Sequence, residues 1–252
     1  MKQRVRFTKL GKIRFLSHRD LARIWERSLR RSGVRVAYSE GFSPRPRLSF
    51  GLALSTGYES LGEYLDIDLH ADAPVSPDDL PALVTPSLPV GMTAQVAVPL
   101  EPGAESLQSA VTSSSWRLEV VGPEPSALAD AVERALAADE LPIVVERKGT
   151  ETTIDARPAI LSLALTGDDD ALPPGVVPLR SSTTLTAELA TQPRSLRPAE
   201  LLRALDPSWH EGRVLRTHQW TLVDGARCEP IPLGDLGAGG ATSAAHAGAR
   251  AS

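Results

Sequence analysis

The chain has 252 residues, 42% of them hydrophobic, and a formal net charge of -4, as expected of a globular protein with one large domain or two modest ones. No run of about eighteen apolar residues is present, as a membrane span requires, and the first ten residues lack the apolar core of a signal peptide, so we expect a cytoplasmic protein. The single cysteine, Cys228, excludes an internal disulfide and a cluster or zinc site built from this chain's thiolates. We therefore expect no metal and no cofactor.

Residues 1–100 predict the element order β-α-β-β-β-α-β. Ser17 and Asp20 have the spacing of a helix start, and Gly33 suits the left-handed conformation that ends a helix. The apolar patterns predict the other elements, which are strands at Gln3–Lys9, Val34–Tyr38, Leu48–Leu54, Glu63–Leu69 and Thr93–Val98 and a short helix at Pro77–Val84.

Residues 101–114, rich in Ser, Gly and Glu, predict a linker. Residues 115–226 then nearly repeat the first order, with elements predicted at Trp116–Val121, Ser126–Ala138, Ile143–Glu146, Ile160–Leu165, Thr183–Leu189, Pro198–Leu205 and Val214–Leu222. Two tandem ferredoxin-like, split β-α-β domains account for both parts and predict an α+β fold. Residues 167–175 predict an exposed loop, and residues 227–252 a disordered tail.

The N-terminal region is strongly basic. Fourteen of the first 50 residues are Lys or Arg and three are acidic, a formal charge of +11, against about -15 for the rest of the chain. On the predicted helix, like charges recur every three or four residues, and they repel unless an anion neutralises them; they are Arg19, Arg23, Arg27 and Arg30. The ladder is either a solvated face, neutralised by the acidic remainder of the chain, or a face that binds phosphates.

A Pro-Arg segment follows the helix and is the strongest single candidate for an anion site. Pro44 and Pro46 hold the backbone extended beside Arg45 and Arg47, and two pre-ordered guanidinium groups suit phosphate or carboxylate. The alternative is that these arginines pair with Glu59 or Glu63 within the fold. Tyr38 and Phe42, which shortly precede these prolines, are candidates for base stacking.

The first predicted strand contains two more arginines, and these could form ion pairs within the fold. Arg4 and Arg6 share one face, and Asp66 and Asp68 share a face of a later strand, so neighbouring strands would form cross-strand ion pairs. A metal held by the two aspartates is conceivable, but no third oxygen ligand is apparent nearby.

His18 is the one residue with a candidate catalytic role. It stands at a helix start, and as a proton shuttle beside Tyr38 or Arg45 it could serve RNA cleavage by the 2′-hydroxyl. The alternative is a packed histidine on the apolar side of the helix. No nucleophile elbow, Walker loop, His-Glu-x-x-His or dinucleotide fingerprint is present in the sequence.

Long, ordered motifs in the first 100 residues resemble the radical-SAM-linked domain family; they are Lys12-x-Arg-Phe-Leu-Ser-His18-x-Asp-Leu, Arg27-x-Leu-Arg-Arg-x-Gly33, Ala37-Tyr-Ser-x-Gly-Phe-x-Pro-x-Pro46, Ser49-Phe-Gly and Glu63-Tyr-Leu-Asp66. That family occurs free-standing or fused behind cobalamin-binding radical S-adenosylmethionine (SAM) enzymes, and its own activity is uncharacterised. The chain lacks the Cys-x-x-x-Cys-x-x-Cys motif, so the resemblance implies a free-standing form whose radical SAM enzyme is a separate polypeptide. The layout is also similar to that of CRISPR repeat-processing endoribonucleases, an analogy of fold alone.

Three functions remain open at this point. The first is a non-catalytic accessory protein that binds RNA or a ribonucleoprotein substrate through its basic N-terminal face and presents it to a radical SAM enzyme. The second is a metal-independent endoribonuclease that uses His18 and Tyr38. The third is a docking module whose basic face pairs with an acidic protein.

Overall fold

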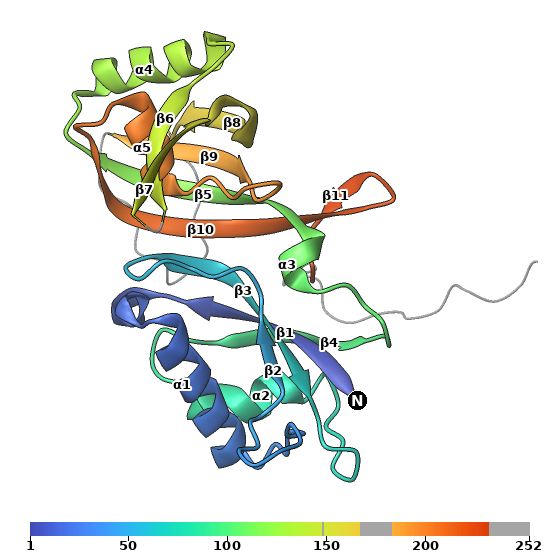
Figure 1. Cartoon of the computed structure of the whole chain (residues 1–252). Helices are drawn as coiled ribbons and strands as arrows, with labels where there is room; N and C mark the ends of the chain where they lie inside the picture. The colour runs from blue at the N-terminus through green and yellow to red at the C-terminus, as the bar shows by residue number, and fades with distance from the viewer. Residues whose placement is uncertain (148, 167–182, 232–252) are drawn as a thin grey trace, which may run out of the picture.

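The computed structural model of the protein describes residues 1–147, 149–166 and 183–231. The fold is mixed α+β. Nine of the described strands join in one large, mostly antiparallel sheet, and two more form a separate hairpin. In Figure 1 the chain forms two halves, one above the other, with α1 and α2 in the lower half and α4 and α5 in the upper half. We refer to residues 2–100 as the first half and to residues 107–231 as the second half.

The first half places its helices against a four-stranded part of the sheet. The strand order is β4-β1-β3-β2, and each neighbouring pair is antiparallel. Trp25 of α1 is fully buried and packs edge-on against Phe7 of β1, with ring centroids 4.9 Å apart. The elements are β1 (Lys2–Lys9), η1 (Gly11–Phe15), α1 (His18–Arg31), β2 (Leu48–Phe50), β3 (Glu59–Asp68), α2 (Leu80–Val84), η2 (Thr85–Ser87) and β4 (Ala94–Leu100).

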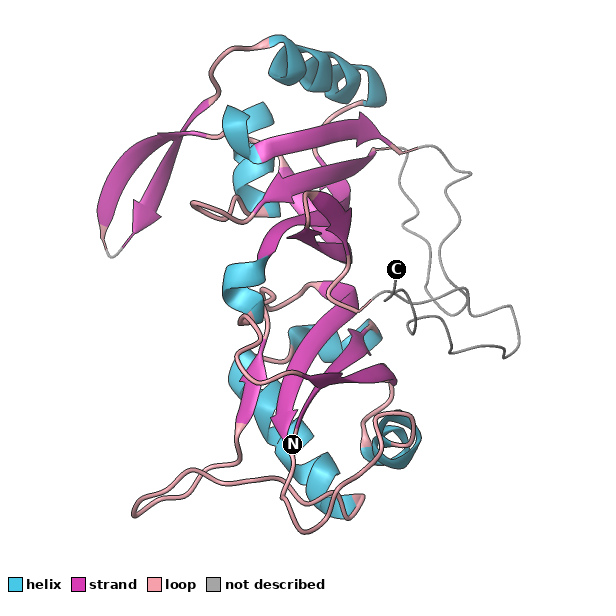
Figure 2. Cartoon of the chain, turned by 90° about the vertical axis from the view of Figure 1, so that its right-hand side faces the viewer, coloured by secondary structure: helices cyan, strands magenta, loops and turns pink. Residues whose placement is uncertain are grey.

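The second half continues the same sheet in the order β10-β5-β9-β8, again with antiparallel neighbours. Its core is formed by one face of these strands together with α4 and α5. The hairpin of β6 and β7 stands away from the large sheet (Figure 2). The elements are α3 (Leu107–Ala110), β5 (Val111–Val121), α4 (Pro125–Ala137), β6 (Pro142–Arg147), β7 (Thr150–Asp155), η3 (Arg157–Ala159), β8 (Ile160–Leu165), β9 (Thr184–Ala190), α5 (Pro198–Leu205), β10 (His210–Val223) and β11 (Ala226–Cys228).

The two halves meet where β10 runs parallel to β3. Two residue pairs carry this pairing, Leu215 with Glu59 and Arg216 with Ser60. The junction also holds two ion pairs, a buried one with 2.5 Å between Arg216 and Glu63 and a partly exposed one with 2.5 Å between Arg213 and Glu59. Apolar contacts join the halves as well, since Tyr58 of the first half packs edge-on against Trp116 of the second.

Most predicted elements are confirmed, but the strand predicted at Val34–Tyr38 is wrong. This segment makes two isolated bridges, Val36 to Leu69 and Tyr38 to Pro46. The backbone of the segment divides its hydrogen bonds between two partners, because the Ala37 N–H donates to Asp68 at 2.7 Å while the Ala37 carbonyl accepts from Arg47 at 2.8 Å, so no continuous ladder forms with either. The strand predicted at Leu48–Leu54 is shorter, since β2 ends at Phe50.

Two segments that the sequence places outside the domains are structured. Residues 107–114, within the predicted linker, form α3 and the start of β5. At the start of the predicted tail, Glu229 pairs with Arg6 at 2.5 Å and Ile231 is buried. The predicted loop at 167–175 and the rest of the tail, residues 232–252, lie outside the described residues. None of the described helices is both long and apolar enough to cross a membrane.

Candidate functional site

Helix α1 begins and ends at the residues that the sequence indicates. The Ser17 hydroxyl accepts a hydrogen bond from the Asp20 backbone N–H at 3.2 Å and donates one to the Asp20 carboxylate at 2.6 Å. At the other end Gly33 has a φ of 74°, and the Val34 N–H bonds back to the Leu29 carbonyl at 3.0 Å. A polar N-cap and a left-handed glycine therefore fix the ends of the helix.

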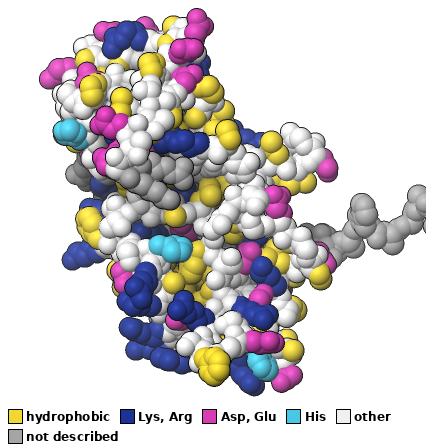
Figure 3. Space-filling model, in the orientation of Figure 1, with side chains coloured by type: hydrophobic (Ala, Val, Ile, Leu, Met, Phe, Trp, Pro, Cys, Tyr) yellow, Lys and Arg dark blue, Asp and Glu magenta, His cyan; other side chains and the backbone are white. Residues whose placement is uncertain are grey.

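Helix α1 has an apolar face and an arginine face. Its buried residues, Leu21, Trp25, Ser28 and Leu29, turn toward the sheet. The four arginines of the predicted ladder, Arg19, Arg23, Arg27 and Arg30, are all exposed. Among them the described residues supply one ion pair, between Arg23 and Asp20 at 3.7 Å. Lys and Arg side chains accordingly gather over this part of the first half in Figure 3.

The Pro-Arg segment is fixed through its backbone and leaves its side chains in solvent. The Arg45 N–H donates to the Ser39 hydroxyl at 3.0 Å, and the Arg47 N–H donates to the Ala37 carbonyl at 2.8 Å. The side chains of Arg45, Arg47 and Phe42 are exposed. These two arginines and the four ladder arginines of α1, which are Arg19, Arg23, Arg27 and Arg30, are called the basic face below.

The internal partners proposed for the Pro-Arg segment are used elsewhere. Glu59 binds Arg213, and Glu63 binds Arg216. Within the described part of the chain, neither Arg45 nor Arg47 has an ion pair, and no arginine of the basic face pairs with an acid of the second half. The acidic remainder therefore does not neutralise the basic face through direct contacts among these residues.

Aromatic side chains accompany the arginines near the C-terminal end of α1. Tyr38 is 53% exposed, and Phe42 is fully exposed. Tyr38 lines an open groove of about 400 Å³ together with Arg30, Arg35 and His70. An exposed ring beside guanidinium groups can stack on an unpaired base while the cations contact the phosphates.

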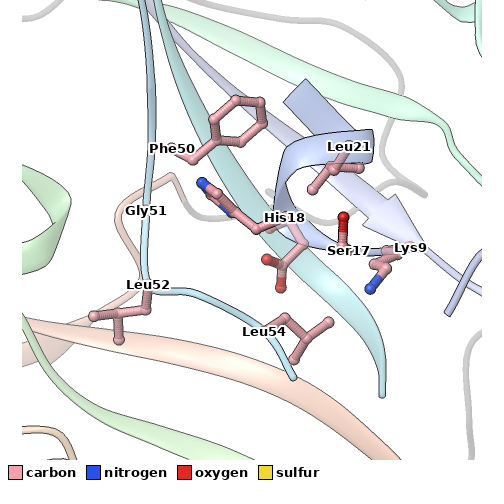
Figure 4. A pocket seen from close by; sticks show the side chains of 9 residues that line it. Lys9, Ser17, His18, Leu21, Phe50, Gly51, Leu52 and Leu54 are labelled. Atoms are coloured by element: carbon pink, nitrogen blue, oxygen red, sulfur yellow. The ribbon is translucent and has the colours of Figure 1, made fainter. Parts of the chain in front are cut away.

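His18 lies at the opposite end of α1, over a small pocket of about 10 Å³ (Figure 4). Its ring is exposed at the surface and packs edge-on against Phe50, with centroids 5.2 Å apart. Ser17, which also lines the pocket, is engaged with Asp20 as the helix cap. The pocket has room for about one water molecule.

Lys9 and Glu63 line the same pocket and are its charged residues apart from His18. The Lys9 ammonium group donates hydrogen bonds to the carbonyls of Arg14 and Leu16, each at 3.2 Å. Burial lowers the pKa of Lys9 below its usual 10.5, and the negative charge of Glu63 opposes that shift. These groups are held by the fold, so they are structural partners rather than free acids or bases.

The two residues considered for RNA cleavage are not brought together. His18 and Tyr38 line different pockets, one at each end of α1, and fourteen helical residues span about 20 Å. A general base must lie within hydrogen-bonding reach of the proton it removes. His18 and Tyr38 therefore cannot act on the same proton in this arrangement.

The expected cross-strand ion pairs form in part. Arg4 binds Asp66 at 2.7 Å, as predicted, but Arg6 binds Glu229 and lies beside Tyr64. Gly62 leaves room for Arg6, because a β-carbon there would lie 3.1 Å from its guanidinium nitrogen. In the described ranges no three His, Cys, Asp or Glu side chains gather as metal ligands would.

The sequence reasoning missed the buried charge network at the junction of the halves, which joins Glu59 and Glu63 of β3 to Arg213 and Arg216 of β10. These partners are more than 150 positions apart. Two arginines three positions apart in one long strand were the available signal, but only the pairing of β3 with β10 identifies their partners.

One comparison places the chain in a known family. A model of the family described as an uncharacterized protein conserved in bacteria (DUF2344) matches residues 2–198. That range includes the basic face, the His18 pocket and the second half as far as the start of α5. No curated protein matches the chain.

Proposed function

The chain belongs to this bacterial family, and from the basic face we propose that it is a non-catalytic accessory protein that binds RNA, or a ribonucleoprotein substrate, for a radical SAM enzyme. The observation that carries the proposal is a set of six exposed arginines, five of them without an ion pair among the described residues. Phosphate groups are anions that such a set of guanidinium groups binds well.

The arrangement of the basic face favours RNA over an acidic protein. Tyr38 and Phe42 are exposed near Arg30 and the Pro-Arg segment. Stacking on a base requires an accessible aromatic ring, whereas an ion-pairing interface between proteins does not. Single-stranded RNA would use both features, its phosphates against the arginines and its unpaired bases against the rings.

The radical SAM partner rests on the sequence resemblance. With one cysteine, the chain cannot supply the three thiolates of a radical SAM cluster motif, so the enzyme would be a separate polypeptide. The proposal assigns RNA binding to this protein and the chemistry to the partner. A cytoplasmic location, expected from the sequence, is part of the same proposal.

We also propose that each half is a ferredoxin-like domain. Support comes from the two antiparallel strand orders, β4-β1-β3-β2 and β10-β5-β9-β8, which are equivalent when the strands of each half are numbered along the chain. Helices α1 and α2 occupy the two crossovers of the first half, and α4 and α5 occupy those of the second. The hairpin of β6 and β7 would then be an insertion. An experimental structure with another strand order in either half would contradict this.

The experiment is cross-linking of the protein to RNA in cell extract, followed by sequencing of the attached RNA. The test variant is Arg45→Ala/Arg47→Ala. The matched control is Arg134→Ala/Arg203→Ala, which removes the same charge from exposed positions of the second half. We expect a defined RNA class with the wild type and the control and its loss in the test variant.

Two outcomes would overturn the proposal. RNA recovery that is equal in all three proteins would reject the basic face as the site. Recovery of a protein partner without RNA above background would favour the docking function. The proteins recovered in the same experiment test the proposed radical SAM partner. That partner must carry the Cys-x-x-x-Cys-x-x-Cys motif.

A further inference from the structure

Besides the groove at Tyr38 and the pocket at His18, a cleft of about 320 Å³ opens where the two halves meet. Its floor is formed by sheet residues of the second half, Ser114, Trp116, Leu189 and Arg216. One wall is the start of α5, and the other is the segment from Leu52 to Ser55 with Tyr58 of the first half. Leu52 and Leu54 also line the His18 pocket (Figure 4), so one stretch of chain separates the two cavities. Small-molecule sites often lie at such junctions and begin at about this volume.

Two buried polar atoms on the floor of the cleft have no partner. They are the indole N–H of Trp116, which is 8% exposed, and the hydroxyl of Ser114, which is 2% exposed. Their neighbours on the opposite face of β5 are satisfied, since Ser113 donates to Glu188 at 2.7 Å and Ser115 accepts from Trp220 at 2.8 Å. Buried polar groups are nearly always hydrogen-bonded. The described chain supplies no partner for these two groups, which leaves both available to a ligand of the cleft.

The charge of the lining favours an anion. Arg197 and Arg216 both line the cleft, and no Asp or Glu is among the described residues that do. Arg216 is neutralised by Glu63, but the exposed Arg197 has no ion pair within the described chain. Arg197 is also the N-cap of the eight-residue helix α5, whose N-terminal end carries a partial positive charge.

The remaining lining is apolar and partly flat. Leu52, Leu189 and Leu196 contribute aliphatic surface. The ring of Trp116 is held edge-on by Tyr58, with centroids 5.9 Å apart. Water alone would satisfy the donors but would leave this apolar surface wet, whereas an organic molecule would cover it.

We propose that this cleft binds a small organic anion, with its carboxylate or phosphate group toward Arg197 and a flat apolar part against Trp116. The indole N–H of Trp116 and the Ser114 hydroxyl would hydrogen-bond to acceptor atoms of the ligand. The site is separate from the basic face and does not depend on RNA binding.

The test uses nuclear magnetic resonance of the 15N-labelled full chain and follows its four tryptophan indole N–H signals. The signals are assigned from nuclear Overhauser effects in the unmodified protein. The probes are adenosine monophosphate, benzoate and inorganic phosphate, each at millimolar concentration. We expect the Trp116 signal to move with one of the two organic probes. The Trp220 signal should stay fixed, because its N–H is bonded to Ser115 on the opposite face. A response to the nucleotide alone identifies a phosphate-bearing ligand, and a response to benzoate alone identifies a carboxylate.

Variants at two exposed arginines decide whether the response belongs to the cleft. Arg197→Gln should weaken binding of the active probe about tenfold or more, since it removes a charged hydrogen-bond donor. Arg203→Gln, at an exposed position on the same helix, should leave the affinity unchanged. A Trp116 signal that ignores all three probes, or that moves equally in both variants, would overturn the proposal.

Discussion

The arginines of β1 and β10 and those of α1 differ in what neutralises their positive charge. Arg4, Arg6 and Arg216 are buried, and each has a carboxylate within 2.7 Å. The arginines of α1 are exposed, and most have no carboxylate partner among the described residues. A buried charge needs a partner because desolvation is costly, whereas an exposed charge is balanced by water and salt. The exposed set is therefore the one that remains able to bind an external anion.

The buried set has its own role at the junction of the halves. The parallel pairing of β3 with β10 extends over two residue pairs, and the ion pairs of Glu59 and Glu63 cross the same boundary. Directional charge pairs fix an orientation that a short ladder alone would leave loosely defined. We infer that these ion pairs set how the two halves face each other, and with them the walls of the cleft.

The largest expected effect comes from breaking one buried pair. Glu63→Ala would leave Arg216 and Lys9 without their nearest carboxylate, and we expect the free energy of unfolding to fall by about 3–5 kcal/mol. Urea unfolding measures this. The control is Glu26→Ala, at an exposed acid on α1, with an expected change within about 0.5 kcal/mol. If the two variants are equally stable, the buried arginines do not need a carboxylate partner more than the exposed ones do, and this part of the account is wrong.

The next effect concerns the aromatic residues beside the exposed arginines. Tyr38→Ala and Phe42→Ala should each weaken binding of single-stranded RNA by about 1–3 kcal/mol, the contribution of one stacked base. The salt dependence should not change, because no charge is removed. Fluorescence anisotropy with a labelled RNA measures both quantities. Leu222→Ala, at an exposed apolar residue of β10, is the control, and an equal loss in that variant would argue against stacking.

A smaller effect is expected at the start of the helix that carries the exposed arginines. Ser17→Ala removes the hydroxyl that caps α1 and should lower the free energy of unfolding by about 1 kcal/mol. Ser17→Thr keeps a capping hydroxyl and should retain most of that stability in thermal or urea unfolding. If the two variants are equally destabilised, the cap does not stabilise the helix as inferred.

The smallest effect is a pH dependence at His218, which lies near Arg6 and Arg227. Burial, and to a lesser extent these two arginines, lowers the pKa of His218 below 6.5, while Glu229 opposes the shift. The unfolded chain then takes up a proton near pH 6.5 that the folded chain does not, so stability is lost as the pH falls below 6.5. His218→Phe keeps a ring to stack on Trp220 and should reduce this loss, measured by urea unfolding at neutral pH and about one pH unit below 6.5. If the variant loses as much stability as the wild type when the pH falls, groups other than His218 cause the loss.

The sequence predicted those features that depend on local signals. Helix α1 follows from its apolar spacing and from Ser17 and Gly33. For Arg45 and Arg47 the sequence left two possibilities open, an exposed pair or internal ion pairs with Glu59 or Glu63. The partners of Glu59 and Glu63 could not be found in this way, because they depend on where β10 lies in the sheet. The same holds for the cleft, whose lining comes from segments of both halves.

The most direct test of the account is the salt dependence of binding to single-stranded RNA. If the six arginines of the basic face contact phosphates, the logarithm of the binding constant should fall with the logarithm of salt concentration with a slope of about -4. Arg45→Ala/Arg47→Ala should reduce the steepness by about 1.4, while Arg134→Ala/Arg203→Ala should keep the wild-type slope. Equal slopes in both double variants, or no RNA binding by the wild-type protein at low salt, would contradict the account.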